Sequence, residues 1–148
     1  MKNIYLFTVV LILFVNPVFS QEDTETWSKS LDIMAVPQGG IDLTNTQDGF
    51  SNQSNVFVVV NFTKGKNTLT SFYSVTNSVG MAYSRSLSED YGMYAVATKN
   101  VLTEGGYLGV GATKNVGKSA IFIEIGSPWN TWLPGLSIGV FIPVTFKI

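Results

Sequence analysis

The stretch that decides the fold lies at the carboxyl end and reads Gly135-Leu136-Ser137-Ile138-Gly139-Val140-Phe141-Ile142-Pro143-Val144-Thr145-Phe146-Lys147-Ile148. One set of alternate positions is apolar throughout, from Leu136 to Ile148. The other set holds glycine, serine, threonine, lysine, proline and one phenylalanine. Successive side chains of a β-strand point to opposite faces of a sheet. The alternation therefore predicts a long strand with one apolar face.

The same alternation recurs upstream, between clusters of glycine, asparagine, serine and proline. No stretch combines helical spacing with a capped start, so the pattern predicts an all-β domain of about eight antiparallel strands. The predicted segments before the last one are 29–36, 55–63, 68–76, 79–87, 91–99, 106–113 and 118–126. The turn at Asn77 and Ser78 is the weakest, and one long bent strand over 68–87 is the alternative.

The amino end has the layout of a secretory signal peptide over residues 1–20. A short basic start precedes the apolar run Ile4–Val15, which is too short for the ~20 residues that a spanning helix needs. A polar leader follows over 21–28, and the barrel domain is predicted over 29–148.

Composition narrows the chemistry. The chain of 148 residues has no cysteine and no histidine, which removes disulfides, the commonest metal ligand and the commonest general base. A net charge of −1 argues against nucleic acid as a partner. Charged residues make up 13% of the chain, against ~25% in soluble domains. We expect no cofactor, no metal site and no catalytic set.

The side chains between the apolar rows decide which face is inside. They are mostly glycine, serine, threonine and alanine, which suit the narrow bore of an eight-stranded barrel better than a water-facing surface. The apolar rows then face lipid, and the barrel must close, since an open edge in hydrocarbon leaves backbone groups unpaired. The predicted lipid-facing residues are Ile121, Ile123, Ile125, Leu136, Ile138, Val140, Ile142, Val144 and Phe146.

Two further groups of residues follow from this orientation. Glu124 points into the bore near mid-strand, with Lys118 and Lys147 as candidate partners for its charge. Aromatic residues near the strand ends are candidates for the membrane interface. They are Trp27, Tyr91, Tyr107, Trp129 and Trp132.

A relaxed phosphate-binding-loop pattern occurs at Ala112–Ser119. That chemistry needs a helix after the loop, whereas a β-patterned run follows here. We therefore interpret Asn115–Lys118 as a tight turn.

The chain resembles the small outer-membrane β-barrel proteins of Gram-negative bacteria. The resemblance rests on the signal peptide, the meander of short strands and a terminal strand that runs to the end of the chain. Members of that family end in an alternating apolar strand that closes on an aromatic residue and is recognised by the barrel-assembly machinery. Here Phe146 keeps the parity, but the final residue is Ile148.

The sequence thus predicts an up-and-down barrel in the outer membrane. We expect a non-enzymatic protein that acts through its surface loops, in envelope integrity, in adhesion or as an accessory subunit of a membrane complex. The predicted partners are the lipid bilayer, the barrel-assembly machinery and an envelope protein. The alternative is a soluble barrel, periplasmic or secreted, that binds a small apolar ligand.

Overall fold

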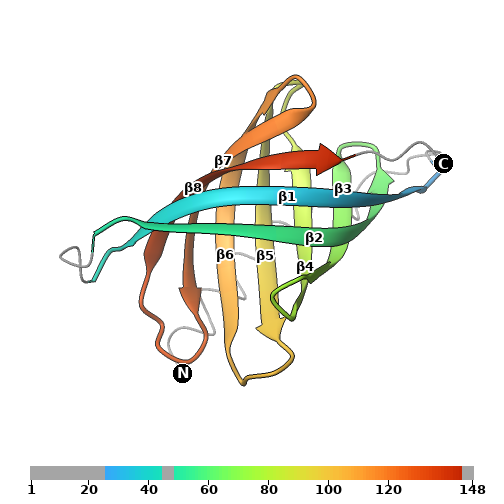
Figure 1. Cartoon of the computed structure of the whole chain (residues 1–148). Coiled ribbons are helices and arrows are strands. Elements are labelled where there is room, and N and C mark those ends of the chain that lie inside the picture. Colours follow the sequence, from blue (N-terminus) through green and yellow to red (C-terminus); the bar gives the residue numbers. More distant parts are fainter. Residues whose placement is uncertain (1–25, 45–48, 145–148) are drawn as a thin grey trace.

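A computed structural model describes residues 26–44 and 49–144 of the chain. Eight strands form one closed barrel in which each strand pairs antiparallel with the next and the last pairs with the first (Figure 1). The strands are β1 (Ser28–Asp42), β2 (Ser51–Lys64), β3 (Asn67–Ser74), β4 (Ser78–Ser86), β5 (Tyr91–Asn100), β6 (Gly106–Val116), β7 (Ser119–Pro128) and β8 (Gly135–Val144). The predicted fold class is confirmed. The predicted signal peptide and most of the leader lie outside the described residues.

The predicted segments 29–36 and 55–63 are too short, because most of the sequence between them, which was expected to be a long connection over 37–54, is strand. β1 has 15 residues and β2 has 14, and their ladder continues to the pair Gly40 and Ser51. This part of β1 also pairs with β8, from Gln38 to Asp42. Pairing on both sides satisfies the backbone of a stretch whose glycines and polar residues give no apolar alternation. The hairpin of β1 and β2 extends to the left in Figure 1.

The uncertain turn between β3 and β4 is real. Asn77 adopts a φ of 61°, and its N–H donates to the carbonyl of Ser74 over 3.0 Å. Asparagine tolerates this left-handed conformation better than most residues. Residues 68–87 therefore form two strands and not one bent strand.

The connections divide between the two ends of the barrel because every strand reverses direction. The connections 43–50, 75–77, 101–105 and 129–134 lie at one end, which we call the long-loop rim. The connections 65–66, 87–90 and 117–118 lie at the other end, which we call the short-turn rim.

The apolar rows lie on the outer face of the barrel. Ile121 and Ile123 have exposed fractions of 43% and 50%, and Ile138 and Ile142 are exposed as well. Their neighbour Val140 is half-buried on the same face. The described residues of these rows thus lie on the outer face, and their contact with lipid remains a prediction. Phe146 lies outside the described residues. Within 26–44 and 49–144, no helix has the length and apolar character to cross a membrane.

The core lies inside the barrel. Its buried apolar residues are Val36, Val59, Tyr94 and Phe122, which come from four different strands. The partly buried residues Met34, Phe57, Val96 and Phe141 pack against this cluster.

Candidate functional site

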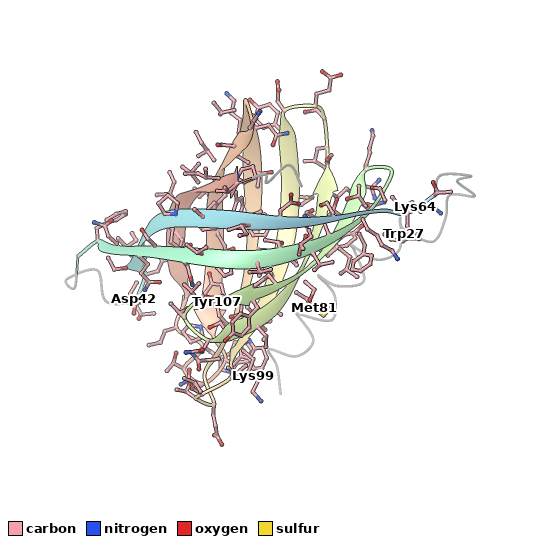
Figure 2. The ribbon with its side chains drawn as sticks, turned by 45° about the vertical axis from the view of Figure 1, so that its right-hand side comes forward. Trp27, Asp42, Lys64, Met81, Lys99 and Tyr107 are labelled. Atoms are coloured by element: carbon pink, nitrogen blue, oxygen red, sulfur yellow. The ribbon has the colours of Figure 1, made fainter. Side chains whose placement is uncertain are left out.

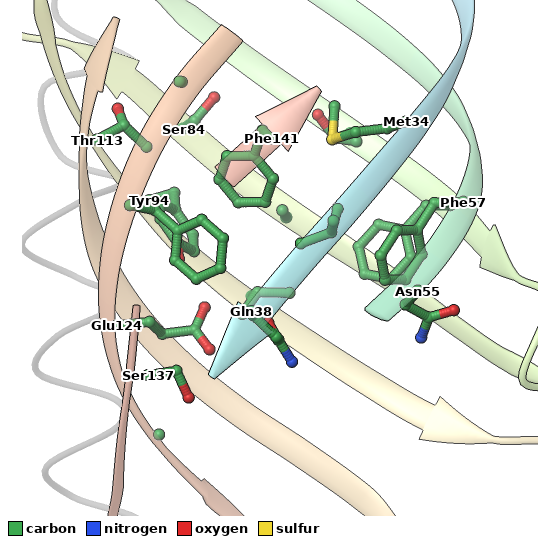
Figure 3. A pocket seen from close by; sticks show the side chains of 18 of the residues that line it. Met34, Gln38, Asn55, Phe57, Ser84, Tyr94, Thr113, Glu124, Ser137 and Phe141 are labelled. Atoms are coloured by element: carbon green, nitrogen blue, oxygen red, sulfur yellow. The ribbon is translucent and has the colours of Figure 1, made fainter. Parts of the chain in front are cut away.

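The bore is the concave site of the molecule. It holds about 1140 Å³ of open space and is lined by residues from all eight strands. Glu124, Ser137 and Gln38 lie on one side of the aromatic rings, and Thr113 and Ser84 lie on the other (Figure 3). The bore therefore has a polar half toward each rim and an apolar middle.

Aromatic rings form the apolar middle. Phe122 stacks on Phe141 with ring centroids 4.4 Å apart, and Tyr94 meets Phe141 edge-on at 5.8 Å. A second edge-on pair joins Phe57 and Phe72 at 5.2 Å. Rings at these separations attract beyond simple burial and narrow the passage between the two halves.

Glycines on the inner face make room for these rings. Phe72, Tyr94 and Phe122 each stand directly opposite a glycine on the next strand. These glycines are Gly80, Gly111 and Gly139, and a Cβ on any of them would come within 2.3–2.6 Å of the facing ring. These glycines therefore have a specific role in the bore, because each leaves room for the aromatic ring of the residue that faces it on the neighbouring strand.

Glu124 is the buried acid of the bore. Its exposed fraction is 9%, and the hydroxyl of Tyr107 donates a hydrogen bond to its Oε1 over 2.5 Å. Gly109 and Gly126 leave the space that these two side chains occupy. The hydroxyl of Tyr94, also buried, has no hydrogen-bond partner within the described part of the chain. A carboxyl group held by one donor lies here at the boundary between the apolar middle and the long-loop half.

Asp32 is the corresponding acid in the short-turn half. Its Oδ2 accepts hydrogen bonds from Ser30 over 2.7 Å and from the amide of Asn61 over 3.1 Å. Thr70 in turn donates to Asn61 over 2.7 Å. Asp32 is therefore held by a network over β1, β2 and β3, whereas Glu124 accepts from Tyr107 alone within the described residues.

A second hydrogen-bond network lies in the long-loop half, at the ends of β2 and β3. Ser74 is fully buried and donates to Asn55 over 2.6 Å, and Asn55 donates to Thr76 over 3.0 Å. The backbone N–H of Thr76 donates to Ser74. Hydroxyl and amide side chains thus satisfy one another without charge.

The structure shows a partner of Glu124 that was not predicted. Lys118 lies in the exposed turn between β6 and β7, too near the rim to reach mid-strand. Lys147 lies outside the described residues. Tyr107, predicted as an interface aromatic, is the partner instead, because odd positions of β6 face the bore. The inward direction of Glu124 is as expected, and the role of Tyr107 is corrected.

The other four predicted aromatics are exposed near the ends of the barrel. Trp27 and Tyr91 lie at the short-turn rim, at the starts of β1 and β5. Trp129 and Trp132 lie in the 129–134 connection at the long-loop rim. Their contact with a membrane interface remains a prediction.

The phosphate-loop pattern forms no phosphate site of the predicted kind. Ala112–Val116 belong to β6, Ser119 opens β7, and Gly117 makes the turn with a φ of 63°. The predicted tight turn is present, but it comprises only Gly117 and Lys118, because Asn115 and Val116 pair with β7. A strand follows where a helix would be needed.

Sequence reasoning missed the aspartate network and the Tyr107 contact. Asp32 lies in the predicted segment 29–36, but the alternation within one segment gives no register that would place it against Asn61. For Tyr107 the parity of β6 was readable from Gly109, Gly111 and Thr113, which share its face.

The long-loop rim carries exposed apolar side chains and few charges. Leu102 has an exposed fraction of 75%, the highest among the large hydrophobic residues of the described chain. Trp132 is exposed at a φ of 54°, an uncommon conformation for a bulky residue. Further exposed apolar residues of these connections are Leu43, Phe50, Val75, Val101, Trp129 and Leu133.

Comparison with known proteins gives little further. The chain matches no protein-family model and no curated protein. A solved structure that aligns with it is the de novo designed TMB2.3, determined by solution NMR. The identity is 13%, the alignment covers 85% of this chain and 100% of that chain, and the TM-score is 0.43. The description of the fold as an eight-stranded barrel rests on the strand pairing of this chain itself.

Proposed function

We propose that this protein is a non-enzymatic β-barrel of a bacterial outer membrane that acts through the long-loop rim. The observation that carries the proposal is the outer face of the closed barrel. Isoleucine, valine, leucine and methionine side chains stand exposed there at mid-strand on neighbouring strands. A continuous apolar surface of this kind is unfavourable in water and favourable against acyl chains.

The closed ladder supports the same placement. Within the described residues every strand pairs with a neighbour on both sides, so the sheet has no edge strand. A spanning structure in hydrocarbon requires this closure. The strands of eight to fifteen residues also suit a crossing, for which ~9–11 tilted residues are needed.

The alternative of a soluble barrel requires the apolar rows to face inward. Ile121 and Ile123 are instead half exposed on the outside, and serine, threonine and asparagine line much of the bore. This arrangement favours the membrane protein over the soluble one.

The difference between the two rims suggests how the barrel is oriented in the membrane and which surface contacts a partner. Outer-membrane barrels place long connections outside the cell and short turns in the periplasm. The long-loop rim would then face outward with Leu102, Trp129 and Trp132 exposed. Exposed apolar and aromatic side chains on loops are the composition of a contact surface for another protein. We propose an envelope protein or a host surface as the partner, and the barrel-assembly machinery for insertion.

The first test is membrane insertion. Expressing cells are fractionated, and the membrane fraction is run on a gel with and without boiling. A folded barrel migrates differently before and after boiling. Recovery in the soluble fraction, with no heat-modifiable band, would contradict the proposal.

The second test separates the loops from the barrel. A double variant, Leu102→Ser with Trp132→Ser, is compared with Val116→Ser, which changes an exposed apolar residue at the opposite rim. We expect the loop variant alone to lose adhesion, detergent resistance or a cross-linked partner, with the heat-modifiable band unchanged. Full complementation of a deletion strain by the loop variant would refute action through this rim.

The non-enzymatic part has its own control. Membrane lipids of cells with and without the protein are compared by mass spectrometry, together with Glu124→Gln. We expect no lipid mass change that depends on the protein. A change that disappears in Glu124→Gln would assign an enzymatic role to the bore.

A further inference from the structure

Basic residues gather at one end of this barrel. Six lie at the short-turn rim, namely Lys29, Lys64, Lys66, Arg85, Lys114 and Lys118. The acids that the described chain places in the turns there are Glu89 and Asp90. At the opposite end, Lys99 stands with Asp42 and Glu104, and Figure 2 shows Lys99 far from Lys64. A chain with a net charge of −1 thus presents a locally basic rim.

The basic residues form a connected arc on the outer face. Lys64 stands opposite Asn67, which stands opposite Arg85 on β4. Tyr91 on β5 then stands opposite Lys114 on β6. The alternation of the strands directs Lys64 and Lys114 to the outer face, and Arg85 and Tyr91 also border the mouth of the bore. The arc follows the circumference from β2 to β6.

Two of the lysines stand over aromatic rings. The ammonium of Lys29 lies 5.8 Å from the ring centroid of Phe62, its cross-strand partner. The ammonium of Lys114 lies 5.7 Å from the ring of Tyr91, also its cross-strand partner. A cation over an outward-facing ring suits the boundary between hydrocarbon and headgroups of a membrane, because the ring can contact hydrocarbon while the charge lies among the headgroups.

Arg85 adds an unsatisfied donor. Its Nη1 is shielded from water and has no hydrogen-bond partner within the described part of the chain. A guanidinium presents donors in a planar fork that matches phosphate geometry. Arg85 therefore adds a positive charge to the arc, although its shielded Nη1 is not itself accessible to a lipid phosphate.

We propose that the short-turn rim binds the anionic headgroups of phospholipids in the leaflet that surrounds it. This inference rests on the proposed membrane insertion. It adds to that function a class of lipid, the anionic phospholipids. It also adds an orientation of the barrel, because the contact favours a negatively charged leaflet around the short-turn rim. Basic residues at a membrane surface attract anionic lipid in this way, within about a Debye length.

The test uses the full mature chain, which keeps the acidic leader residues 22, 23 and 25 in place. The protein is refolded into phosphatidylcholine vesicles that contain a trace of spin-labelled phosphatidylglycerol or spin-labelled phosphatidylcholine. Electron paramagnetic resonance gives the fraction of each label immobilised at the protein. We expect a preference of about threefold for phosphatidylglycerol at low salt, within the factor of about five that a single exposed ion pair provides.

Three variants make the test specific. Lys29→Gln with Lys64→Gln and Lys114→Gln should reduce the preference to near equality, and the three corresponding Lys→Arg changes should keep it. The matched control Lys99→Gln removes a lysine from the other end and should leave the preference unchanged. A preference that persists in the glutamine variant, or is absent in the wild type, overturns the inference.

Insertion is scored separately on every sample by heat-modifiable migration. A wild-type chain that does not insert overturns the proposed function and this inference together. A chain that inserts but shows no lipid preference overturns this inference alone.

Discussion

The two ends of the barrel are built from different chemistry. Within the described residues, the long-loop rim exposes leucine, valine and tryptophan side chains and has Lys99 with two acids, Asp42 and Glu104. The short-turn rim carries six basic residues, of which Lys64 and Arg85 are half-buried, with two acids in its turns. The two acids of the bore also differ in position, because Glu124 lies toward the long-loop rim and Asp32 lies toward the short-turn rim. The barrel is therefore directional along its axis.

The difference shows how the up-and-down topology of one short chain can form two rims of different composition. Alternate connections of an up-and-down barrel always return to the same end, so residues from four separate connections collect at one rim. A short sequence can thereby gather apolar loops at one end and lysines at the other. Between them, the rings in the middle of the bore separate the two halves.

The largest expected effect tests the outer face between the rims. Ile123→Lys places a charge at the middle of β7, where a bilayer makes a lysine cost about 3 kcal/mol of unfolding free energy. Val116→Lys places the same charge at the short-turn rim, where the cost is at most about 1 kcal/mol. Denaturant unfolding in vesicles measures both. Equal, small costs would mean that water surrounds the outer face, since exposed substitutions in water stay within about 0.5 kcal/mol.

A smaller effect compares the two acids. Tyr107→Phe removes the hydrogen bond to the buried Glu124, and we expect a loss of about 2 kcal/mol in unfolding free energy. Ser30→Ala removes one of the donors to Asp32 but leaves Asn61 in place, so the expected loss is below about 0.5 kcal/mol. The same denaturant titration applies. Similar losses for the two variants would refute the contrast between a single donor and a network.

The smallest expected effect on stability concerns the aromatic rings that separate the two halves of the bore. A Cβ at Gly111 would lie 2.6 Å from the ring of Tyr94 and 2.7 Å from the carbonyl oxygen of Ile123. Gly111→Ala should therefore cost about 1.5 kcal/mol through overpacking. Gly105→Ala at the long-loop rim meets its nearest atom, Thr103 Oγ1, at 3.2 Å and should change stability little. Equal stability of the two variants would show that the ring in the bore adjusts freely.

Much of the barrel was predictable because its strands alternate. The apolar rows of β7 and β8, the inward direction of Glu124 and the turn at Gly117 followed from parity and turn residues. The extent of β1 and β2 was not predictable, because Pro37 and two glycines interrupt the pattern and pairing with β8 holds that stretch in the sheet. The task of Tyr107 was missed because its partner lies on another strand.

The sequence alone determined that the chain is all-β and which side of most strands is apolar, since these depend on a period of two between neighbours. The number of strands became definite only when the structure showed the turn at Asn77. Only the tertiary structure decided what meets across the bore and around the rims. Register and closure set which ring faces which glycine, which hydroxyl reaches Glu124 and which lysines stand side by side. Those contacts join residues far apart in the chain, and no local period encodes them.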